Sequence, residues 1–323
     1  MTSLYPLRFQ PLFRHYLWGG DKLRTLLGKS CDEQSTCAES WEICDRGADQ
    51  SRVAVGPLTG KSLGELVATH GGALLGRHAP QPRFPLLWKF LDAQQKLSVQ
   101  VHPDDARAAR LLPPDLGKNE AWVVMHAEPG SLIYAGLKRG FDRAALEREI
   151  SRGTCELCLH SFAPQVGDCV FLPAGVVHAI GNGLLVAEIQ QASDTTWRLF
   201  DWNRVGPDGQ PRTLHLAEAL EAIDYQAGPI TPARPSATEN PQRERLVSCD
   251  KFVLDRWRLT TSQDLPDDDR CHILTVVEGA VTVTGDAAEV PLKFGETLLV
   301  PAQRPATSMI PRASAIILDA YLP

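Results

Sequence analysis

Long apolar segments are missing from this chain of 323 residues. No stretch is long and apolar enough to span a bilayer, and Met1–Arg8 lacks the apolar core of a signal peptide. We therefore expect a cytoplasmic protein without membrane contact. Positive charge is not in excess either, because 33 lysines and arginines face 39 aspartates and glutamates and leave a net charge of -6. This argues against nucleic acid as the main partner, whereas a small phosphorylated ligand needs only a few local cations.

Paired cysteine motifs of the kind that hold structural zinc are also missing. Cys155 and Cys158 have the C-x2-C spacing, but no second C-x2-C or cysteine–histidine pair accompanies them. In the cytosol the eight cysteines are expected to be thiols. We therefore interpret Cys155 and Cys158 as thiols on an amphipathic strand.

The hydrophobic periodicity predicts a mainly β chain with a few helices. One helix is expected to begin after Ser62, which has the capping-box spacing to Glu65, and to bury Leu63, Leu66, Val67, Leu74 and Leu75. The other helices are expected over 103–112, 142–150 and 214–223, the last with Leu216, Leu220 and Ile223 in phase. Strands are expected over 84–91, 97–101, 122–125, 132–134, 157–162, 169–172, 184–190 and 195–200.

A change of composition divides the chain. Residues 227–245 are polar, contain four prolines and show no periodicity, which is typical of a linker or a long surface connection. We therefore predict an N-terminal domain over 1–226, a proline-rich linker over 227–245 and a C-terminal β domain over 246–323. In the C-terminal domain, strands are expected over 252–259, 272–277, 280–284, 297–300 and 315–318.

A repeat connects the two domains. Gly167 precedes Pro173 by six positions and Gly295 precedes Pro301 by the same interval, with three apolar residues before each proline. Upstream of each, 123–130 resembles 275–279. The longer first copy is explained if the helix expected over 142–150 is an insertion. We interpret the pattern as two copies of one β-barrel unit.

Four residues of the first copy could hold a metal ion. Gln100 and His102 are two apart in an alternating run, so their side chains leave one face of a strand. Glu120 begins another apolar run, and His178 follows Pro173 by five positions. Two imidazoles, one carboxylate and one amide oxygen suit a divalent transition metal. Ala306 takes the place of His178 in the second copy, so we expect no second metal site there.

Longer motifs carry a family resemblance. Residues 167–182 fit the second cupin motif, G-x5-P-x-G-x2-H-x3-N, at every fixed position. The chain further resembles the type I mannose-6-phosphate isomerases, particularly their short bacterial form, in four motifs: Trp18-Gly19-Gly20, LSVQVHP over 97–103, GKNEAW over 117–122 and QQASDTTWR over 190–198. The resemblance implies two cupin units, each a double-stranded β-helix or jelly roll, with helical insertions in a catalytic N-terminal part.

The resemblance also implies an activity and a cofactor. The expected enzyme is a zinc-dependent aldose–ketose isomerase that interconverts mannose 6-phosphate and fructose 6-phosphate through an enediolate. One Zn²⁺ per chain would be held by the residues that match the family's ligands: Gln100, His102, Glu120 and His178. We expect a monomer or a weak homodimer with a sugar phosphate as its partner.

Further roles follow from the resemblance alone. Arg198 matches an arginine that closes the active site, and Lys118 and Asp194 match positions proposed for proton transfer. Lys89 and Ser98 match positions associated with the substrate phosphate. Long eukaryotic members carry an additional helical insertion for which this chain has no room, so phosphate contacts from that region cannot be transferred.

Several of these residues have an independent chemical rationale. Lys118 precedes Glu120 by two positions and could point toward the metal, where it would suit acid–base chemistry, although a solvated lysine is the simpler alternative. Lys89 lies within an apolar run, where burial requires a phosphate or carboxylate partner. Arg198 is always charged and could stabilise an enediolate or orient a carboxylate. Trp18, beside two glycines, could pack against a sugar.

Two alternatives stay open at this point. The same site could catalyse glucose 6-phosphate isomerisation or an iron-dependent oxidation. The chain could instead be a non-catalytic sugar or sugar-phosphate sensor. A sensor would not need Arg198, Lys118 and Asp194 together with four metal ligands, and this favours an enzyme.

Overall fold

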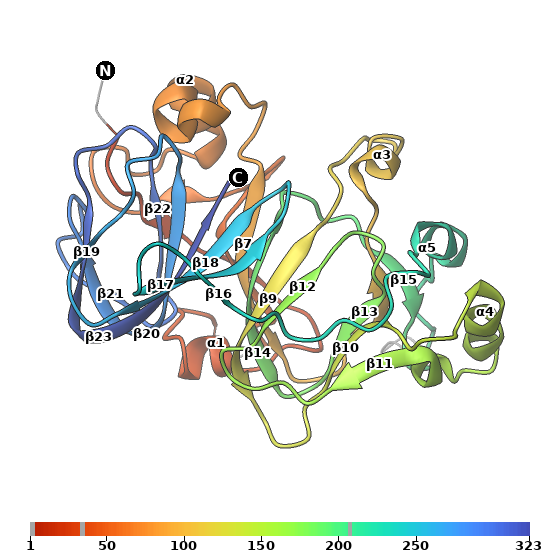
Figure 1. Cartoon of the computed structure of the whole chain (residues 1–323). Coiled ribbons are helices and arrows are strands. Elements are labelled where there is room, and N and C mark those ends of the chain that lie inside the picture. Colours follow the sequence, from red (N-terminus) through yellow and green to blue (C-terminus); the bar gives the residue numbers. More distant parts are fainter. Residues whose placement is uncertain (1–3, 33–35, 206–208) are drawn as a thin grey trace.

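The computed structural model describes residues 4–32, 36–205 and 209–323. The fold is mainly β, as predicted, and places two β-rich halves side by side (Figure 1). Strands from residues beyond 243 form the half at the left of this view. The half at the centre and right contains residues 86–200 and carries three short helices on its outer side. Among the described residues, no helix is both long and apolar enough to cross a membrane.

The first half consists of two antiparallel sheets that pack face to face. The six-stranded sheet has the order β12-β9-β14-β7-β3-β2, with β2 (Leu12–Arg14), β3 (Glu39–Ile43), β7 (Leu86–Ala93), β9 (Glu120–Ala127), β12 (Cys169–Leu172) and β14 (Leu184–Gln191). The five-stranded sheet has the order β11-β10-β13-β8-β15, with β8 (Val99–Val101), β10 (Ile133–Leu137), β11 (Leu159–Phe162), β13 (His178–Ile180) and β15 (Trp197–Phe200). Leu91 and Val124 of the first sheet pack against Ile133 and Ile180 of the second.

The C-terminal half is one eight-stranded sheet. Its strands are β16 (Ser236–Ala237), β17 (Arg243–Ser248), β18 (Val253–Leu259), β19 (Gln263–Asp264), β20 (His272–Val283), β21 (Leu292–Lys293), β22 (Thr297–Val300) and β23 (Ser308–Tyr321). The two strands predicted over 272–277 and 280–284 are one strand, β20. Its pairing with β23 shifts register around Gly279, whose φ of 74° places a bend there without ending the strand. Two small pairs join β1 (Phe9–Gln10) to β6 (Arg52–Val53) and β4 (Asp45–Arg46) to β5 (Asp49–Gln50).

Helix α2 (Leu63–Leu75) confirms the capping box predicted at Ser62, and helix α4 (Arg143–Ser151) confirms the helix predicted over 142–150. Ser62 Oγ accepts from the backbone N–H of Glu65, and the Glu65 carboxylate accepts from the backbone N–H of Ser62. All five apolar positions predicted on this helix are buried. Asp142 caps α4, which lies inside the first copy of the repeat. Two short helical turns are α1 (Lys22–Thr25) and η1 (Gly76–His78).

Three predicted elements differ from the structure. Helix α3 (Asp105–Ala108) is shorter than 103–112, because the N–H groups of Arg110 and Leu111 donate to carbonyls only three residues earlier. The strand predicted over 157–162 begins at Leu159. Cys155–Cys158 form the 3-10 turn η2, so these two buried thiols do not lie on a strand. Helix α5 (Leu216–Ala222) buries Leu220 but leaves Leu216 exposed.

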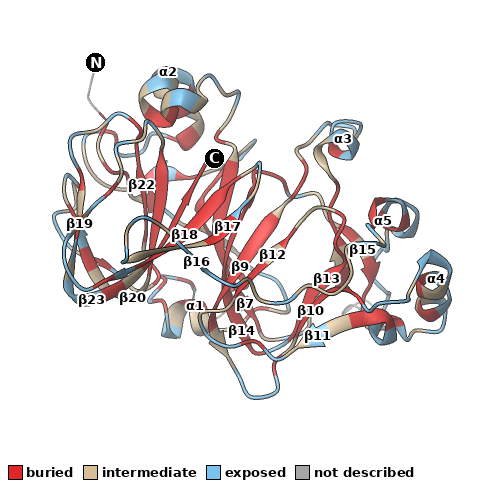
Figure 2. Ribbon diagram, in the orientation of Figure 1, coloured by how far each residue is buried: buried red, intermediate tan, exposed pale blue. Residues whose placement is uncertain are grey.

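A shared apolar core joins the two halves. Leu74 and Leu75 of α2, Phe90 of the six-stranded sheet, and Ile273 and Leu318 of the C-terminal sheet belong to one buried cluster. Figure 2 shows buried ribbon running through the strands of both halves. The backbone of Leu7 forms two hydrogen bonds with Leu299, so the N-terminal segment also pairs with the C-terminal sheet. These contacts fix the orientation of the two halves.

The stretch predicted as a linker over 227–245 lies along the first half. The N–H of Ile230 donates to the carbonyl of Ala135, and the N–H of Ala233 donates to that of Cys169. The same stretch contains β16 and the first residues of β17. It therefore follows the surface of the first half and then enters the C-terminal sheet. The division at 226 and 246 stays a prediction.

The strand pairing supports the internal repeat. The C-terminal strands occur in the order β22-β20-β23-β18-β17-β16, which parallels β12-β9-β14-β7-β3-β2. Gly167 donates its N–H to the carbonyl of Val124 at 2.8 Å, and Gly295 donates to that of Val276, also at 2.8 Å. Glu120 pairs with Leu172, and His272 pairs with Val300. His272 therefore occupies in the second copy the position that Glu120 occupies in the first.

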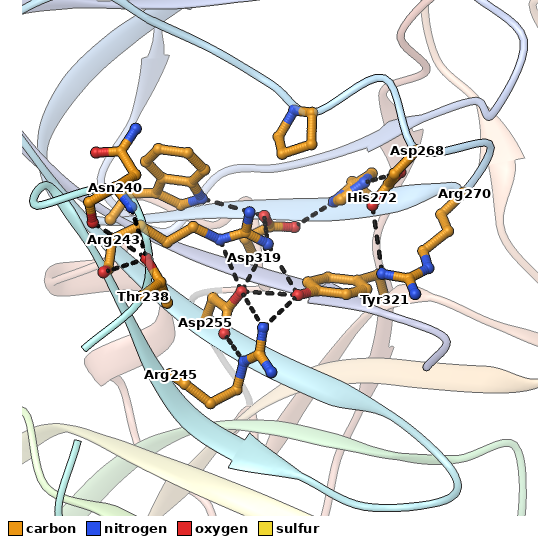
Figure 3. A network of polar contacts seen from close by, with 12 residues as sticks. Thr238, Asn240, Arg243, Arg245, Asp255, Asp268, Arg270, His272, Asp319 and Tyr321 are labelled. Atoms are coloured by element: carbon orange, nitrogen blue, oxygen red, sulfur yellow. Dashed lines mark hydrogen bonds and ion pairs between the residues drawn. The ribbon is translucent and has the colours of Figure 1, made fainter. Parts of the chain in front are cut away.

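His272 belongs to a buried polar network in the C-terminal half (Figure 3). Its Nδ1 lies 2.7 Å from Asp319 and its Nε2 lies 3.2 Å from Asp268. Arg243 forms an ion pair of 2.6 Å with Asp255, which also accepts from the Tyr321 hydroxyl. Burial alone would lower the pKa of His272, but the two carboxylates raise its pKa to about 9.

This network predicts a pH-dependent stability. The folded pKa of His272 lies above its unfolded value of 6.5, so its contribution is complete below about pH 6.5 and is lost as the pH rises through about 9. We expect the wild-type free energy of unfolding to fall by about 3 kcal/mol more across this range than that of His272→Gln, as measured by urea denaturation. His126→Gln, on the half-buried end of β9, is the control. Equal pH slopes for His272→Gln and the wild type would contradict the assignment.

Candidate metal centre and active site

Neighbouring strands bring the predicted residues together. Gln100 of β8 pairs with His178 of β13 on one side and with Arg198 of β15 on the other. His102 follows the end of β8, and Glu120 begins β9 of the opposite sheet. The site therefore lies between the two sheets of the first half, and residues up to 98 positions apart meet there only through sheet pairing.

Three of the four predicted ligands converge. The available donor atoms of His102, Glu120 and His178 all lie within 4.8 Å of one another, and all three residues are buried. His178 Nε2 is 3.2 Å from Glu120 Oε1, and His102 Nε2 is 3.4 Å from Glu120 Oε2. The Gln100 amide lies at the edge of this group, with its nitrogen 3.4 Å from His178 Nε2.

Backbone carbonyls orient both imidazoles. His102 Nδ1 lies 3.0 Å from the carbonyl oxygen of Thr195, and His178 Nδ1 lies 2.9 Å from that of Val176. Since carbonyls only accept, each Nδ1 carries the proton and each Nε2 keeps its lone pair. Glu120 Oε1 is buried and has no hydrogen-bond partner among the described residues. An orphaned carboxylate oxygen beside two oriented Nε2 atoms fits a metal ion, since ligating histidines commonly donate their other N–H in this way.

The electrostatics of the site agree with this arrangement. Burial, together with the charge of Lys118, lowers the pKa of His102 to about 3. Burial also lowers the pKa of His178. Both rings are therefore neutral near pH 7, as ligands must be. Burial alone would raise the pKa of Glu120, but the neighbouring Lys118 ammonium holds it well below its usual range, so the carboxylate is ionised.

A row of buried charged residues begins at this group. Lys118 Nζ contacts Glu120, lies 3.0 Å from His102 Nε2 and lies 3.6 Å from Glu188 Oε1. Lys89 Nζ lies 3.5 Å from the same Glu188 oxygen and 3.3 Å from Glu39. We call these five residues, Glu120, Lys118, Glu188, Lys89 and Glu39, the charged row. Lys118 is 4% exposed, which excludes a solvated surface lysine.

The contacts of Lys89 confirm that this buried residue has an anionic partner, as expected from the sequence. Its position in an apolar run required a phosphate or a carboxylate, and the structure supplies two carboxylates, Glu39 and Glu188. These raise the pKa of Lys89, although burial acts in the opposite direction. Burial and the charge of Glu120 raise the pKa of Glu188 to about 7, against the effect of the two lysines.

Glu39 and Glu188 were missed in the sequence. Glu188 lies within the apolar run 184–191, so the reasoning that singled out Lys89 applies to it equally. Strand pairing places Glu188 directly opposite Lys89. Glu39 precedes Ser40 and Trp41 in a strand whose residues are all buried. For Glu188, a charged residue inside the strand predicted over 184–190 was therefore the available signal.

A cavity of about 260 Å³ opens beside the charged row. Its wall contains every other residue predicted for the site: Trp18, Ser98, Asp194 and Arg198, together with Lys89, Gln100 and Lys118. Trp18 stacks on Tyr16 with ring centroids 5.5 Å apart. Arg198 donates from one terminal nitrogen to the carbonyl of Thr213, while its buried Nε has no hydrogen-bond partner among the described residues. Seven of the predicted residues thus line one cavity, and Lys118 connects it to the converging group of His102, Glu120 and His178.

The charged row predicts a large loss of stability on neutralising Lys89. Lys89→Met leaves Glu39 and Glu188 buried with one cation fewer, and we expect the free energy of unfolding in urea to fall by about 3–5 kcal/mol. Lys61→Met, which breaks an exposed pair with Glu65 on the surface, should cost less than about 1 kcal/mol. Adding Glu188→Gln to Lys89→Met should recover part of the loss. Equal effects of the two lysine substitutions would contradict the buried ion pairs.

Comparison with known proteins agrees with the geometry. Residues 6–119 match the family model described as phosphomannose isomerase type I, catalytic domain, and residues 242–313 match that described as mannose-6-phosphate isomerase, cupin domain. The chain is 35% identical to mannose-6-phosphate isomerase ManA of Bacillus subtilis, over 92% of this chain and 93% of that protein. It is 32% identical to mannose-6-phosphate isomerase of Streptococcus mutans, over 92% of each.

A solved structure extends the likeness to the whole fold. The crystal structure of the mannose 6-phosphate isomerase from Bacillus subtilis superimposes with a TM-score of 0.89 at 30% identity, and the match covers 98% of this chain and 99% of that one. The shared sequence, the cupin domain and the shared fold agree with the motifs found around the site. The chain is therefore a member of the type I mannose-6-phosphate isomerase family of enzymes.

Proposed function

We propose that this protein is a metal-dependent isomerase that interconverts mannose 6-phosphate and fructose 6-phosphate. One observation carries the proposal: two oriented imidazoles and an ionised carboxylate converge beside a cavity lined by both cationic and acidic side chains. Family membership supplies the substrate and the reaction, since the relatives named above are mannose-6-phosphate isomerases. The enzyme would act in the cytoplasm as a monomer or weak homodimer.

One divalent ion per chain would be held by His102, Glu120, His178 and Gln100. Nitrogen and oxygen donors of this kind suit Zn²⁺, which when bound would act as a Lewis acid that stabilises negative charge on the sugar oxygens. The donor group already stabilises a cation, because the Lys118 ammonium lies against His102 and Glu120. A neutral amide in place of a third imidazole or a second carboxylate keeps the site electrophilic.

Proton transfer between C1 and C2 requires groups that can accept and return a proton. Lys118, Asp194 and Glu188 all line the cavity, and Lys118 and Glu188 are within 3.6 Å of each other. Burial keeps water away from both, so a proton that the Lys118 ammonium donates or that Glu188 accepts stays near the substrate. The pKa of Glu188, raised to about 7, suits exchange of a proton near neutral pH.

Arg198 is positioned to stabilise the negative charge of an enediolate. Its backbone pairs with Gln100, and its guanidinium lines the same cavity. The Nε–H, buried and without a protein acceptor among the described residues, is available to a substrate oxygen. Burial and two neighbouring arginines lower the pKa of Arg198, but the guanidinium stays charged.

Turnover is the direct test. We expect purified protein to convert mannose 6-phosphate to fructose 6-phosphate, to lose this activity with a chelator such as EDTA and to regain it with added Zn²⁺. Glucose 6-phosphate, supplied separately, should be converted at least ten times more slowly. Turnover that survives metal removal would contradict the metal dependence, and no turnover with zinc present would favour a sensor.

Metal content tests the ligand assignment independently of activity. His178→Ala removes one imidazole of the converging group, and we expect bound zinc to fall from about one per chain to a small fraction, measured by atomic emission after dialysis. His126→Ala, on the same half but outside the group, should retain the wild-type content. Stoichiometric zinc in His178→Ala would refute this ligand.

A further inference from the structure

Three arginines and one aspartate form a cluster at the rim of the active-site cavity. Asp201 is buried. Arg212 donates two hydrogen bonds to its carboxylate, one from Nε at 2.7 Å and one from a terminal nitrogen at 2.5 Å. Arg204 donates to the same carboxylate at 2.5 Å and to the carbonyl of Lys96 at 2.6 Å. Arg198 is close enough that both arginines lower its pKa. We call these four residues the arginine cluster.

Arg212 stands where two cavities meet. It lines the active-site cavity that Gln100 and Lys118 also line. It lines equally a neighbouring cavity of about 270 Å³, which Arg204 and Asp201 border. Tyr16 and Trp18, stacked on each other, are the other residues shared by both cavities. A ligand that reaches from Gln100 toward this junction therefore passes an aromatic wall and ends at a guanidinium.

The arginine cluster has an excess of positive charge. Three guanidinium groups face one carboxylate, which leaves two positive charges, and a phosphate monoester near neutral pH carries close to two negative charges. Asp201 holds Arg212 through two parallel hydrogen bonds, which fixes the direction of the guanidinium. The other terminal nitrogen of Arg212 forms no hydrogen bond with the described residues, and 40% of the side chain is exposed. Asp201 thus orients the Arg212 guanidinium, and one of its terminal nitrogens stays available to an anionic ligand.

Lys89 is less suited to the same role. Its ammonium is shared between Glu39 and Glu188 and is almost completely buried. A phosphate there would bring a third anion next to these two carboxylates, with Glu120 further along the charged row. Negative charges that lie next to one another repel strongly in a buried site, where the effective dielectric constant is low. The charge distribution therefore favours an anion at the arginine cluster rather than at the charged row.

We propose that Arg212, oriented by Asp201, binds the phosphate group of the substrate at the junction of the two cavities and makes the enzyme selective for phosphorylated sugars. The substrate would lie with its reacting carbons near Gln100 and Lys118 and its phosphate at the arginine cluster. Arg204 adds charge from the second cavity. This inference rests on the proposed isomerase function for the sugar part of the ligand, while the anion site itself can be tested separately.

Arg212→Gln is the first test. It removes the charge and the terminal nitrogens, and we expect the KM for mannose 6-phosphate to rise 10- to 100-fold, with kcat changed less than about 3-fold. Arg212→Lys keeps the positive charge but cannot form the two parallel hydrogen bonds with Asp201. Its KM should lie between those of the wild type and Arg212→Gln. Arg139→Gln, which removes an exposed arginine far along the sequence from both cavities, should match the wild type. An unchanged KM in a folded Arg212→Gln protein would overturn the proposal.

Binding of inorganic phosphate separates this inference from the proposed function. In titration calorimetry we expect phosphate to bind wild type and Arg139→Gln and to bind Arg212→Gln at least ten times more weakly. If mannose 6-phosphate is not turned over but phosphate binding depends on Arg212, the anion site stands and the proposed reaction fails. Phosphate binding that is lost in Lys89→Met but retained in Arg212→Gln would overturn the inference and assign the phosphate to the charged row. Absence of phosphate binding together with an unchanged KM would overturn it as well.

Discussion

The charged row is the interaction on which the rest of the active half depends. Glu120, Lys118, Glu188, Lys89 and Glu39 are all buried, and each carboxylate lies beside an ammonium. Removing one partner would leave an uncompensated charge in the interior. Four strands supply or border these residues, so the row requires the β9-β14-β7-β3 register. It holds Glu120 ionised next to two neutral imidazoles, and this arrangement suits the proposed metal ion.

The two copies of the repeat use one register for different purposes. Glu188 pairs with Lys89 in the first copy, and Asp319 pairs with Asp255 in the second. His272 stands where Glu120 stands, but its partners Asp319 and Asp268 satisfy both ring nitrogens. The first copy therefore keeps donors available beside a cavity, whereas the second uses its polar residues for its own stability. This difference fits the proposal that the first half carries the chemistry and the second supports it through the shared core.

Much of this site could be predicted from residue type and spacing. Gln100 and His102 share one strand face, and Lys89 within an apolar run needed a charged partner. Glu188 met the same criterion and was overlooked, because its partner lies on a strand about 100 residues earlier in the chain and only pairing reveals it. The turn at Cys155–Cys158 and the short α3 were predicted wrongly, since three-residue hydrogen bonding leaves no periodic pattern in so short a segment.

The sequence by itself determined the mainly β class, the pattern of the internal repeat and the family, and it singled out four candidate metal ligands, because strand alternation and fixed glycine–proline spacing are local properties of the chain. Only the tertiary structure decided which charges neutralise one another and which stay open. It places Lys89 in ion pairs with two carboxylates, Glu39 and Glu188. It places Arg212 at the junction of two cavities, where Asp201 binds its guanidinium. The physical reason is that Coulombic pairing depends on distance and burial, and both arise from strand register and sheet packing rather than from sequence separation.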